Sequence, residues 1–269
     1  MLKKITENYF KFRRFSTLGI SFFSWLKNKD IKDNGIYTIR LLGKDFIFTN
    51  PYWFFFNLDE IFFDKVYDLG ECKDTITIVD CGANLGLSII FFKMKYPNSV
   101  IYAFEPDPFL FRLLSKNIKN FSLSNVHLIN SAVWSSNCSL DFIQDNNLGG
   151  HISSSNNHFS LEKKIQVDAI SLNDFIRNKN VYFLKMDIEG AEYEVLNSMV
   201  NSLSNIKFLF VEYHSFYQKP QVLSSILDII SNAGFKYYIK EAYPNMKFPF
   251  KDFKNCFLYD LQLNVFAYK

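Results

Sequence analysis

The chain from residue 75 onward alternates between continuous apolar runs and amphipathic stretches. TITIVDCG, SVIYAFEP, VYFLKMDIEG and KFLFVEYH are typical of strands that are buried on both faces of a sheet. Helical stretches separate these runs, one ending at Pro97 and others beginning at Pro108 and Pro220. This alternation predicts an α/β fold with a doubly wound, mostly parallel sheet. KYYIKEAY and LNVFAYK follow without a substantial helix between them, which predicts an antiparallel hairpin at the C-terminal edge.

Shorter segments complete the expected sheet region. VHLINSAV, residues 126–133, is expected as the third strand. SLDFIQD and KKIQVDAI alternate like paired strands, and they flank a polar loop at 145–160. We therefore expect one sheet-based domain over residues 75–269.

Residues 1–74 do not show this alternation and are expected to form an N-terminal extension. Apolar residues from Leu2 to Leu26 recur at helical spacing, which predicts an amphipathic helix over 2–26. This helix either packs on the body or lies on an anionic membrane surface. Residues 36–63 predict a short strand pair followed by an aromatic helix or loop, whose rings join the core or wall a substrate pocket.

Charge is distributed unevenly. Residues 1–32 hold six Lys and two Arg against two acidic residues, so the rest of the chain sums to −3 within a net charge of +3. An acidic body argues against a nucleic-acid binder. The four cysteines show no C-x-x-C pair, which argues against a zinc site or disulfide framework. Without a secretory signal, this predicts a cytoplasmic location, free or peripheral to the inner face of the membrane.

Two acidic residues follow neighbouring strands, where ligands bind in such sheets. Asp80 opens the turn D-C-G-A-N-L-G, in which Gly82 and Gly86 allow close approach of a ligand to backbone N–H groups. Glu105 ends the next strand, where a carboxylate can accept hydrogen bonds from a ribose diol. The turn is not G-x-G-x-x-G, and Asp80 disfavours a pyrophosphate. The pattern predicts an adenosyl ligand without phosphates, such as S-adenosyl-L-methionine.

Four motifs over residues 75–215 carry a family resemblance. D-C-G-A-N-L-G, A-F-E-P-D-P, N-S-A-V-W and K-M-D-I-E-G-A-E-Y-E-V-L occur in this order. The chain thereby resembles the FkbM family of S-adenosylmethionine-dependent methyltransferases. The resemblance implies a class I methyltransferase fold, Rossmann-like, with seven strands and an antiparallel C-terminal strand. It also implies methylation of hydroxyl oxygens, often on sugars or natural products.

The resemblance assigns cofactor-binding roles to residues at three strand ends. The methionine end of the cofactor would lie at the first turn, its ribose at the second strand end and its adenine at the third. These groups are, in order, Asp80, Gly82, Ala83, Asn84 and Gly86; Glu105, Pro106 and Asp107; and Asn130, Ser131 and Ala132. Asp187, ending the fourth strand, would lie near the methyl-bearing sulfur.

A hydroxyl acceptor needs a general base, and four residues near the strand ends are candidates. His214 has an ordinary pKa near 6.5 that suits the task. Asp187 lies nearest to the transferred methyl, and Glu189 begins the next helix, whose dipole would keep it ionised. Strand alternation places Glu212 and His214 on one face, so that one orients the other. Helix capping and strand-end capping are the structural alternatives for these side chains.

Several alternatives stay open at this level. Asp187, Glu212 and His214 could bind a divalent metal, although no metal is expected. The acceptor is expected to be a small molecule or saccharide, in a glycan or glycolipid, with aromatics such as Tyr52, Trp53 and Phe54 stacking on it. A nucleoside 2′-O-methyltransferase and a non-catalytic scaffold that keeps the cofactor fold are the competing hypotheses.

Overall fold

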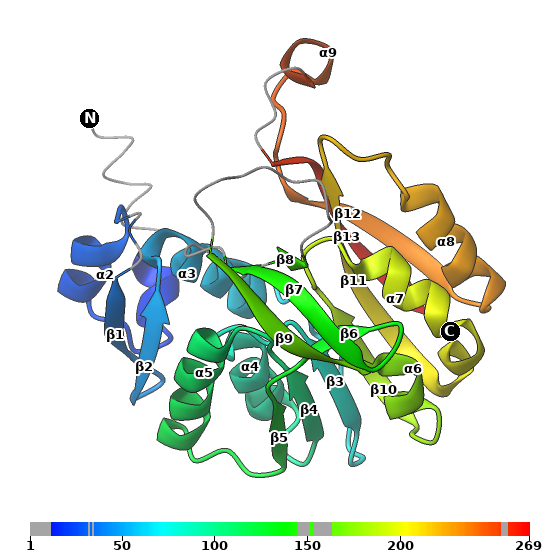
Figure 1. Cartoon of the computed structure of the whole chain (residues 1–269). Coiled ribbons are helices and arrows are strands. Elements are labelled where there is room, and N and C mark those ends of the chain that lie inside the picture. Colours follow the sequence, from blue (N-terminus) through cyan, green and yellow to red (C-terminus); the bar gives the residue numbers. More distant parts are fainter. Residues whose placement is uncertain (1–11, 32, 34, 145–150, 153–162, 254–257) are drawn as a thin grey trace.

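The computed structural model describes residues 12–31, 33, 35–144, 151–152, 163–253 and 258–269 (Figure 1). A seven-stranded sheet forms its centre, and five neighbouring strands run parallel. In spatial order the strands are β12 (Lys236–Tyr243), β13 (Tyr259–Tyr268), β11 (Ile206–Phe216), β10 (Val181–Met186), β3 (Thr77–Cys81), β4 (Val100–Phe104) and β5 (Val126–Ile129). β13 is antiparallel to both of its neighbours. The predicted class I methyltransferase sheet with an antiparallel C-terminal strand is confirmed. In the predicted hairpin, β12 forms the edge of the sheet, whereas β13 lies inside it, next to β11.

Both faces of the sheet are covered, as the unbroken apolar runs predict. Successive residues of β3 point to opposite sides, so that Ile78 and Val79 belong to different hydrophobic cores. One core includes α4 and α5, and the other includes the remaining crossover helices (Figure 1). The helices are α4 (Leu87–Lys95), α5 (Pro108–Asn120), α6 (Leu172–Ile176), α7 (Glu192–Ser198) with the 3₁₀ turn η2 (Val200–Asn205), and α8 (Leu223–Asn232).

The expected third strand is divided between two sheets. β5 ends at Ile129, and β6 (Ala132–Trp134) joins a second, four-stranded sheet. The Asn130 side chain donates to the carbonyl oxygens of Glu105 and Pro106, which anchors the point where the chain leaves the central sheet. The second sheet has the order β6-β9-β7-β8, with β7 (Cys138–Gln144), β8 (His151–Ile152) and β9 (Lys163–Ser171). β7 and β9 pair antiparallel as predicted. Most of the 145–160 loop lies outside the described residues.

The single helix expected over 2–26 is wrong for the part that the structure describes. Residues 12–16 are helical, the chain turns through Gly19 with φ +80°, and α2 (Phe22–Asn28) follows. Phe15 and Trp25 are buried, whereas Phe22 and Leu26 of the same stripe are exposed. Because the turn through Gly19 separates the two helical segments, the apolar residues before and after it do not lie on one helix face. Residues 2–11 lie outside the described residues.

The rest of the N-terminal extension packs on the central sheet. The predicted strand pair is the hairpin β1 (Ile36–Leu41) and β2 (Lys44–Thr49), followed by α3 (Pro51–Leu58) and the π-helical turn η1 (Asp59–Phe63). Phe46 and Phe48 share a core with Ile78 and Phe92. The fully buried Asn117 of α5 hydrogen-bonds to both backbone groups of Ile47 at 2.8 Å and donates to the carbonyl of Leu85 at 2.9 Å. One amide thus ties β2 to the turn that follows β3.

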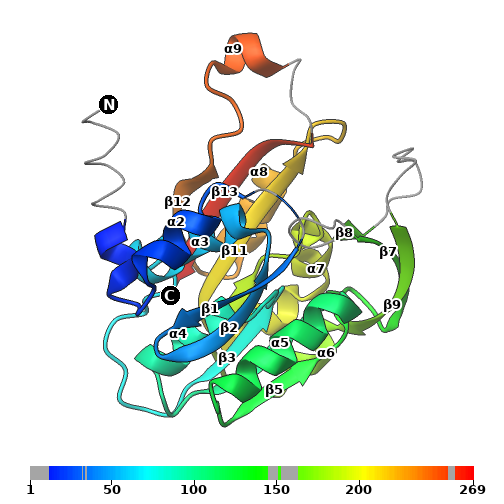
Figure 2. The ribbon, with the colours of Figure 1, turned by 90° about the vertical axis from the view of Figure 1, so that its left-hand side faces the viewer.

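The last helix, α9 (Pro249–Asp252), stands away from the sheet in both views of the ribbon (Figures 1 and 2). It interrupts the connection between β12 and β13, close to the carboxyl ends of the parallel strands. Among the described residues, no helix combines the length and apolarity needed to cross a bilayer.

Candidate active site

A cavity of about 570 Å³ opens at the carboxyl ends of the parallel strands. Its walls come from the turn after β3, the ends of β4, β10 and β11, the second sheet, the α3–η1 segment, and the connection between β12 and β13. Doubly wound sheets place ligands at this edge. The expected site and the observed cavity therefore coincide.

The turn after β3 is fixed by its neighbours on both sides. Gly82 and Ala83 donate their N–H groups to the carbonyl of Phe104, at 3.1 and 2.9 Å. Gly82 has φ +82°, and a Cβ atom there would lie 1.8 Å from the carbonyl oxygen of Asp187. Only glycine fits this position. The turn leaves a backbone cradle that lines the cavity.

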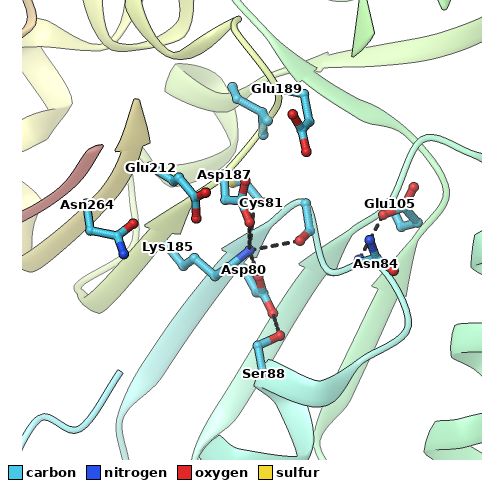
Figure 3. Close-up of polar contacts among 12 residues, drawn as sticks. Asp80, Cys81, Asn84, Ser88, Glu105, Lys185, Asp187, Glu189, Glu212 and Asn264 are labelled. Carbon is cyan, nitrogen blue, oxygen red and sulfur yellow. Dashed lines mark hydrogen bonds and ion pairs between the residues drawn. The ribbon is translucent and has the colours of Figure 1, made fainter. Parts of the chain in front are cut away.

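Glu105 presents a buried carboxylate to the same cavity. It accepts hydrogen bonds from the N–H groups of Asn84, at 2.8 Å, and Asp107, at 3.0 Å (Figure 3). Burial raises the pKa of Glu105 to about 8, against the opposing effect of these hydrogen bonds. A carboxylate held in this way retains acceptor capacity for a diol that enters the cavity.

Asp80 lies behind the turn and does not line the cavity. It is fully buried, 3.3 Å from Nζ of Lys185, and accepts a hydrogen bond from the Ser88 hydroxyl at 2.5 Å (Figure 3). Lys185 also lies 3.3 Å from Oδ2 of Asp187 and donates to the carbonyl of Gly82 at 2.8 Å. Burial lowers the pKa of Lys185, but Asp80, Asp187 and Glu212 outweigh it, so the net pKa is raised. The pair Asp80–Lys185 therefore positions the turn, and Lys185 remains charged.

His214 stands inside a ring of carboxylates. Its Nδ1 lies 3.1 Å from Oε1 of Glu192, and its Nε2 lies 3.5 Å from carboxylate oxygens of both Glu189 and Glu212. The expected pairing of Glu212 with His214 is present. Burial lowers the pKa of His214, yet the three carboxylates raise it well above 6.5. In this environment the imidazole is protonated at neutral pH and acts as a donor.

Glu189 differs from its expected ionisation. It lies in the left-handed region at φ +55°, and Tyr259 donates a hydrogen bond of 2.7 Å to its carboxylate. The helix dipole was expected to keep it ionised, but α7 begins only at Glu192, and burial raises the pKa of Glu189 to about 7. Burial and the charge of Asp187 likewise raise the pKa of Glu212. Two carboxyls of raised pKa thus face the cavity beside Asp187.

Sequence comparison identifies the family. The profile described as the methyltransferase FkbM domain matches residues 80–237. The chain belongs to the FkbM methyltransferase family. It is 32% identical over 161 residues to "Methyltransferase 1" of Beauveria bassiana, a match that spans 52% of this chain and 65% of that protein, just under two thirds of its length.

Two further relatives of this FkbM chain have more specific names. "2-O-methyltransferase NoeI" of Sinorhizobium fredii is 27% identical and matches over 62% of this chain and 75% of its own length. "Hexuronic acid methyltransferase AglP" of Haloferax volcanii is also 27% identical, over 55% and 59%. S-adenosylmethionine is the cofactor expected for this family. The Gly82 cradle and the Glu105 carboxylate fit an adenosyl ligand without phosphates.

The cofactor residues implied by the family resemblance and the base candidates at the strand ends fall into two groups in the structure. Some line the cavity, and others hold the lining in place. The lining group contains Gly82, Ala83, Asn84, Glu105, Pro106, Ser131, Ala132, Asp187, Glu189, Glu212 and His214. Asp80, Gly86, Asp107 and Asn130 belong to the second group: Asp107 caps α5, and Gly86 precedes α4 with φ +90°. Their roles toward the cofactor remain predictions.

The FkbM motifs did not reveal the part of the cavity that the N-terminal extension supplies. Glu60 of η1 lines it and accepts a hydrogen bond of 2.9 Å from the Asn264 amide. Trp53 and Phe54 line it as expected for stacking residues, whereas Tyr52 does not. In the sequence, Glu60 is an acidic residue beside an aromatic run, and no motif marks it as a cavity residue. The π-helical turn that contains it is seen only in the structure.

Asp187, Glu212 and His214 are close enough to be considered as metal ligands. One ligand atom from each lies within 4.8 Å of the other two. Lys185 already contacts Asp187 and carries a charge that would repel a cation there. The absence of a metal requirement stays a prediction, which titration with Mg²⁺ would test.

Proposed function

We propose that this chain transfers the methyl group of S-adenosylmethionine to a hydroxyl oxygen of a sugar-like acceptor. The observation that carries the proposal is the pair of half-buried carboxyls, Glu189 and Glu212, that line the cavity with raised pKa values. A hydroxyl must lose its proton as it attacks, and a carboxyl with a pKa near neutrality is matched to that step. The names of two relatives, a 2-O-methyltransferase and a hexuronic acid methyltransferase, support oxygen as the target and a sugar as the substrate class.

Each residue has a defined part in the proposed reaction. The cofactor, when bound, supplies a methyl group on a sulfonium centre. The turn at Gly82 would line the cofactor end of the cavity, the Glu105 carboxyl would hold the cofactor, and Lys185 keeps the turn in position by its hydrogen bond to the Gly82 carbonyl. Glu189 takes the proton of the attacking hydroxyl, because its pKa of about 7 gives it both basicity and a population of the ionised form. Protonated His214 then stabilises the arrangement of Glu189 and Glu212 from behind.

An acceptor screen with labelled methyl groups tests this function. Purified protein is incubated with S-adenosylmethionine and a panel of methyl glycosides, and the product is mapped by mass spectrometry and NMR. We expect an O-methyl ether on one ring hydroxyl. Methylation of nitrogen or carbon, or turnover only with RNA, would refute the sugar proposal. Cofactor binding with no transfer to any acceptor class would favour the scaffold hypothesis.

We also propose that the N-terminal segment contacts an anionic membrane surface. α2 exposes Phe22, Phe23 and Leu26, with Phe23 82% exposed, and Lys27 lies in its last turn. Because Phe15 and Trp25 belong to the core, a point variant tests this better than a deletion. Phe23→Ser should release the protein from anionic vesicles in sedimentation, whereas Phe250→Ser, which changes a 98% exposed ring on α9, should not. A wild type that never sediments with vesicles would end the proposal.

A further inference from the structure

The cavity has two chemically different ends. Glu105 and Asn84 mark the end assigned to the cofactor, and Glu212 and Asn264 lie on the opposite side of Lys185 and Asp187 (Figure 3). We call this second end the acceptor end. It is lined by Trp53, Phe56, Glu60, Glu212, Tyr243 and Gln262.

Carboxylates outnumber cations around the whole cavity. Within the described part of the chain, five carboxyl side chains line it: Glu60, Glu105, Asp187, Glu189 and Glu212. The lining cations are Lys185 and His214. Lys185 is paired with Asp80 and Asp187, and His214 is paired with three glutamates. A negatively charged acceptor would therefore meet no cation among these described residues that is not already paired.

Glu60 lines the acceptor end and forms no ion pair with any residue that the structure describes. Its side chain accepts a hydrogen bond from the neutral amide of Asn264, and it stands in the field of Glu212 and Asp187, which Lys185 partly offsets. Burial and these like charges raise the pKa of Glu60 to about 8. An ammonium group that enters the acceptor end would favour the ionised form of Glu60 and pair with it, whereas an anion would be repelled by the neighbouring carboxylates.

Aromatic rings stand beside these carboxyls. Tyr243 packs against Trp53, with ring centroids 5.2 Å apart, and against Phe56, at 5.8 Å. Aromatic faces attract ammonium groups through their quadrupole, and they also cover the apolar face of a pyranose ring. Ring faces with an adjacent carboxylate form a suitable environment for an ammonium group on a sugar ring.

We infer that the acceptor end selects a hydroxyl-bearing acceptor that also carries an ammonium group, and that it rejects acceptors with a carboxylate, with Glu60 as the specificity-determining residue. The inference rests on the proposed function, because it names the acceptor class of the same site. It assigns Glu60 to substrate recognition and leaves proton transfer to Glu189.

Binding of three matched probes tests the inference without requiring turnover. The methyl glycosides of glucosamine, glucose and glucuronic acid differ in charge and share a ring. Each is titrated calorimetrically into the whole 269-residue chain saturated with S-adenosylhomocysteine. We expect the amine to bind tightest and the carboxylate to bind at least about tenfold more weakly than the amine. Equal binding of the three, tighter binding of the carboxylate, or no binding of any would overturn the inference.

A variant pair assigns the effect to Glu60. Glu60→Gln keeps the size and one hydrogen-bond acceptor but removes the charge, so that the preference for the amine over the carboxylate should shrink roughly tenfold. Asp64→Asn, an exposed change one residue after η1, should keep the wild-type preference. An unchanged preference in folded Glu60→Gln, verified by S-adenosylhomocysteine affinity, would remove Glu60 from the assignment. Probes that bind in the expected order but receive no methyl group would refute the proposed function and leave this inference standing.

Discussion

The two ends of the cavity are stabilised in opposite ways. At the cofactor end, backbone groups and charges are paired within the protein: Gly82 is hydrogen-bonded on both sides, and Asp80 is neutralised by Lys185. At the acceptor end, burial raises the pKa of both Glu60 and Glu212, and the charge of Glu212 raises that of Glu60 further. A paired site is preorganised and needs little from its ligand, whereas a crowded site gains stability when a ligand compensates its charge. The comparison suggests that cofactor binding tolerates few changes, whereas acceptor choice depends on charge.

The largest expected effect comes from the Gly82 turn. In Gly82→Ala the new Cβ would overlap the carbonyl of Asp187, so the turn must move and S-adenosylhomocysteine binding should disappear in calorimetry. Gly234→Ala is the matched control, since Gly234 has φ +83° and no atom within 4 Å of the added Cβ. The control should lose only about 1–2 kcal/mol of folding stability, from backbone strain, and keep its affinity. Normal affinity in Gly82→Ala would show that the cofactor does not use this cradle.

Removal of the proposed base should give the second largest effect. Glu189→Gln should lower kcat by about 10²–10⁴-fold, while S-adenosylhomocysteine affinity stays within a few-fold of wild type. Glu194→Gln, an exposed change on α7, is the control and should keep full activity. A Glu189→Gln protein with normal turnover would transfer the role to Glu212 or Asp187.

A substitution of Glu105 should change the affinity for the cofactor alone. Glu105→Gln replaces an acceptor of the two N–H groups by an amide and should weaken S-adenosylmethionine binding by about 1.5–3 kcal/mol, roughly tenfold to hundredfold. The exposed Glu241→Gln is the control. Unchanged affinity in calorimetry of a folded Glu105→Gln protein would contradict the ribose assignment.

The smallest predicted effect concerns pH. Glu189 must be ionised to accept a proton, and its pKa is raised to about 7, so kcat/KM should rise about tenfold per pH unit below 7 and level off above it. The profile is measured with wild type and Glu189→Gln, and the variant should lose this inflection. A wild-type profile that is flat between pH 5.5 and 8.5 would indicate a base with an ordinary carboxyl pKa.

The cofactor end could be predicted from sequence because it is built from short motifs at strand ends. Asp80 lies near the end of β3 and Glu105 directly follows β4, and because these neighbouring strands are parallel, their turns meet at the same edge of the sheet. The acceptor end could not, because Glu60 meets Asn264 across 204 positions of the chain. The protonation of His214 was missed for the same reason. It depends on burial and on the carboxylates of Glu189, Glu192 and Glu212, which meet at the imidazole only in the folded chain.

The predicted strand and helix boundaries are wrong where pairing between distant strands or a local turn determines them. Residues 126–133 form one apolar pattern, but Ala132 finds its partner in β9 rather than in β4. In the N-terminal segment, the spacing of apolar residues is compatible with one helix that continues through Gly19. The φ of +80° at Gly19 instead places a turn there. Pairing between distant strands and a local left-handed residue are both invisible to a hydrophobic period.

The Asn117 amide has a consequence for anyone who seeks to redesign the cavity. It joins Ile47 in the extension to Leu85 in the cofactor turn through three hydrogen bonds in a fully buried position. A chimera that imports residues 1–74 from a relative would inherit a β2 backbone not matched to this amide, and would disturb methyl-donor binding together with acceptor choice. New specificity is therefore better sought by changing side chains on the cavity wall than by exchanging segments.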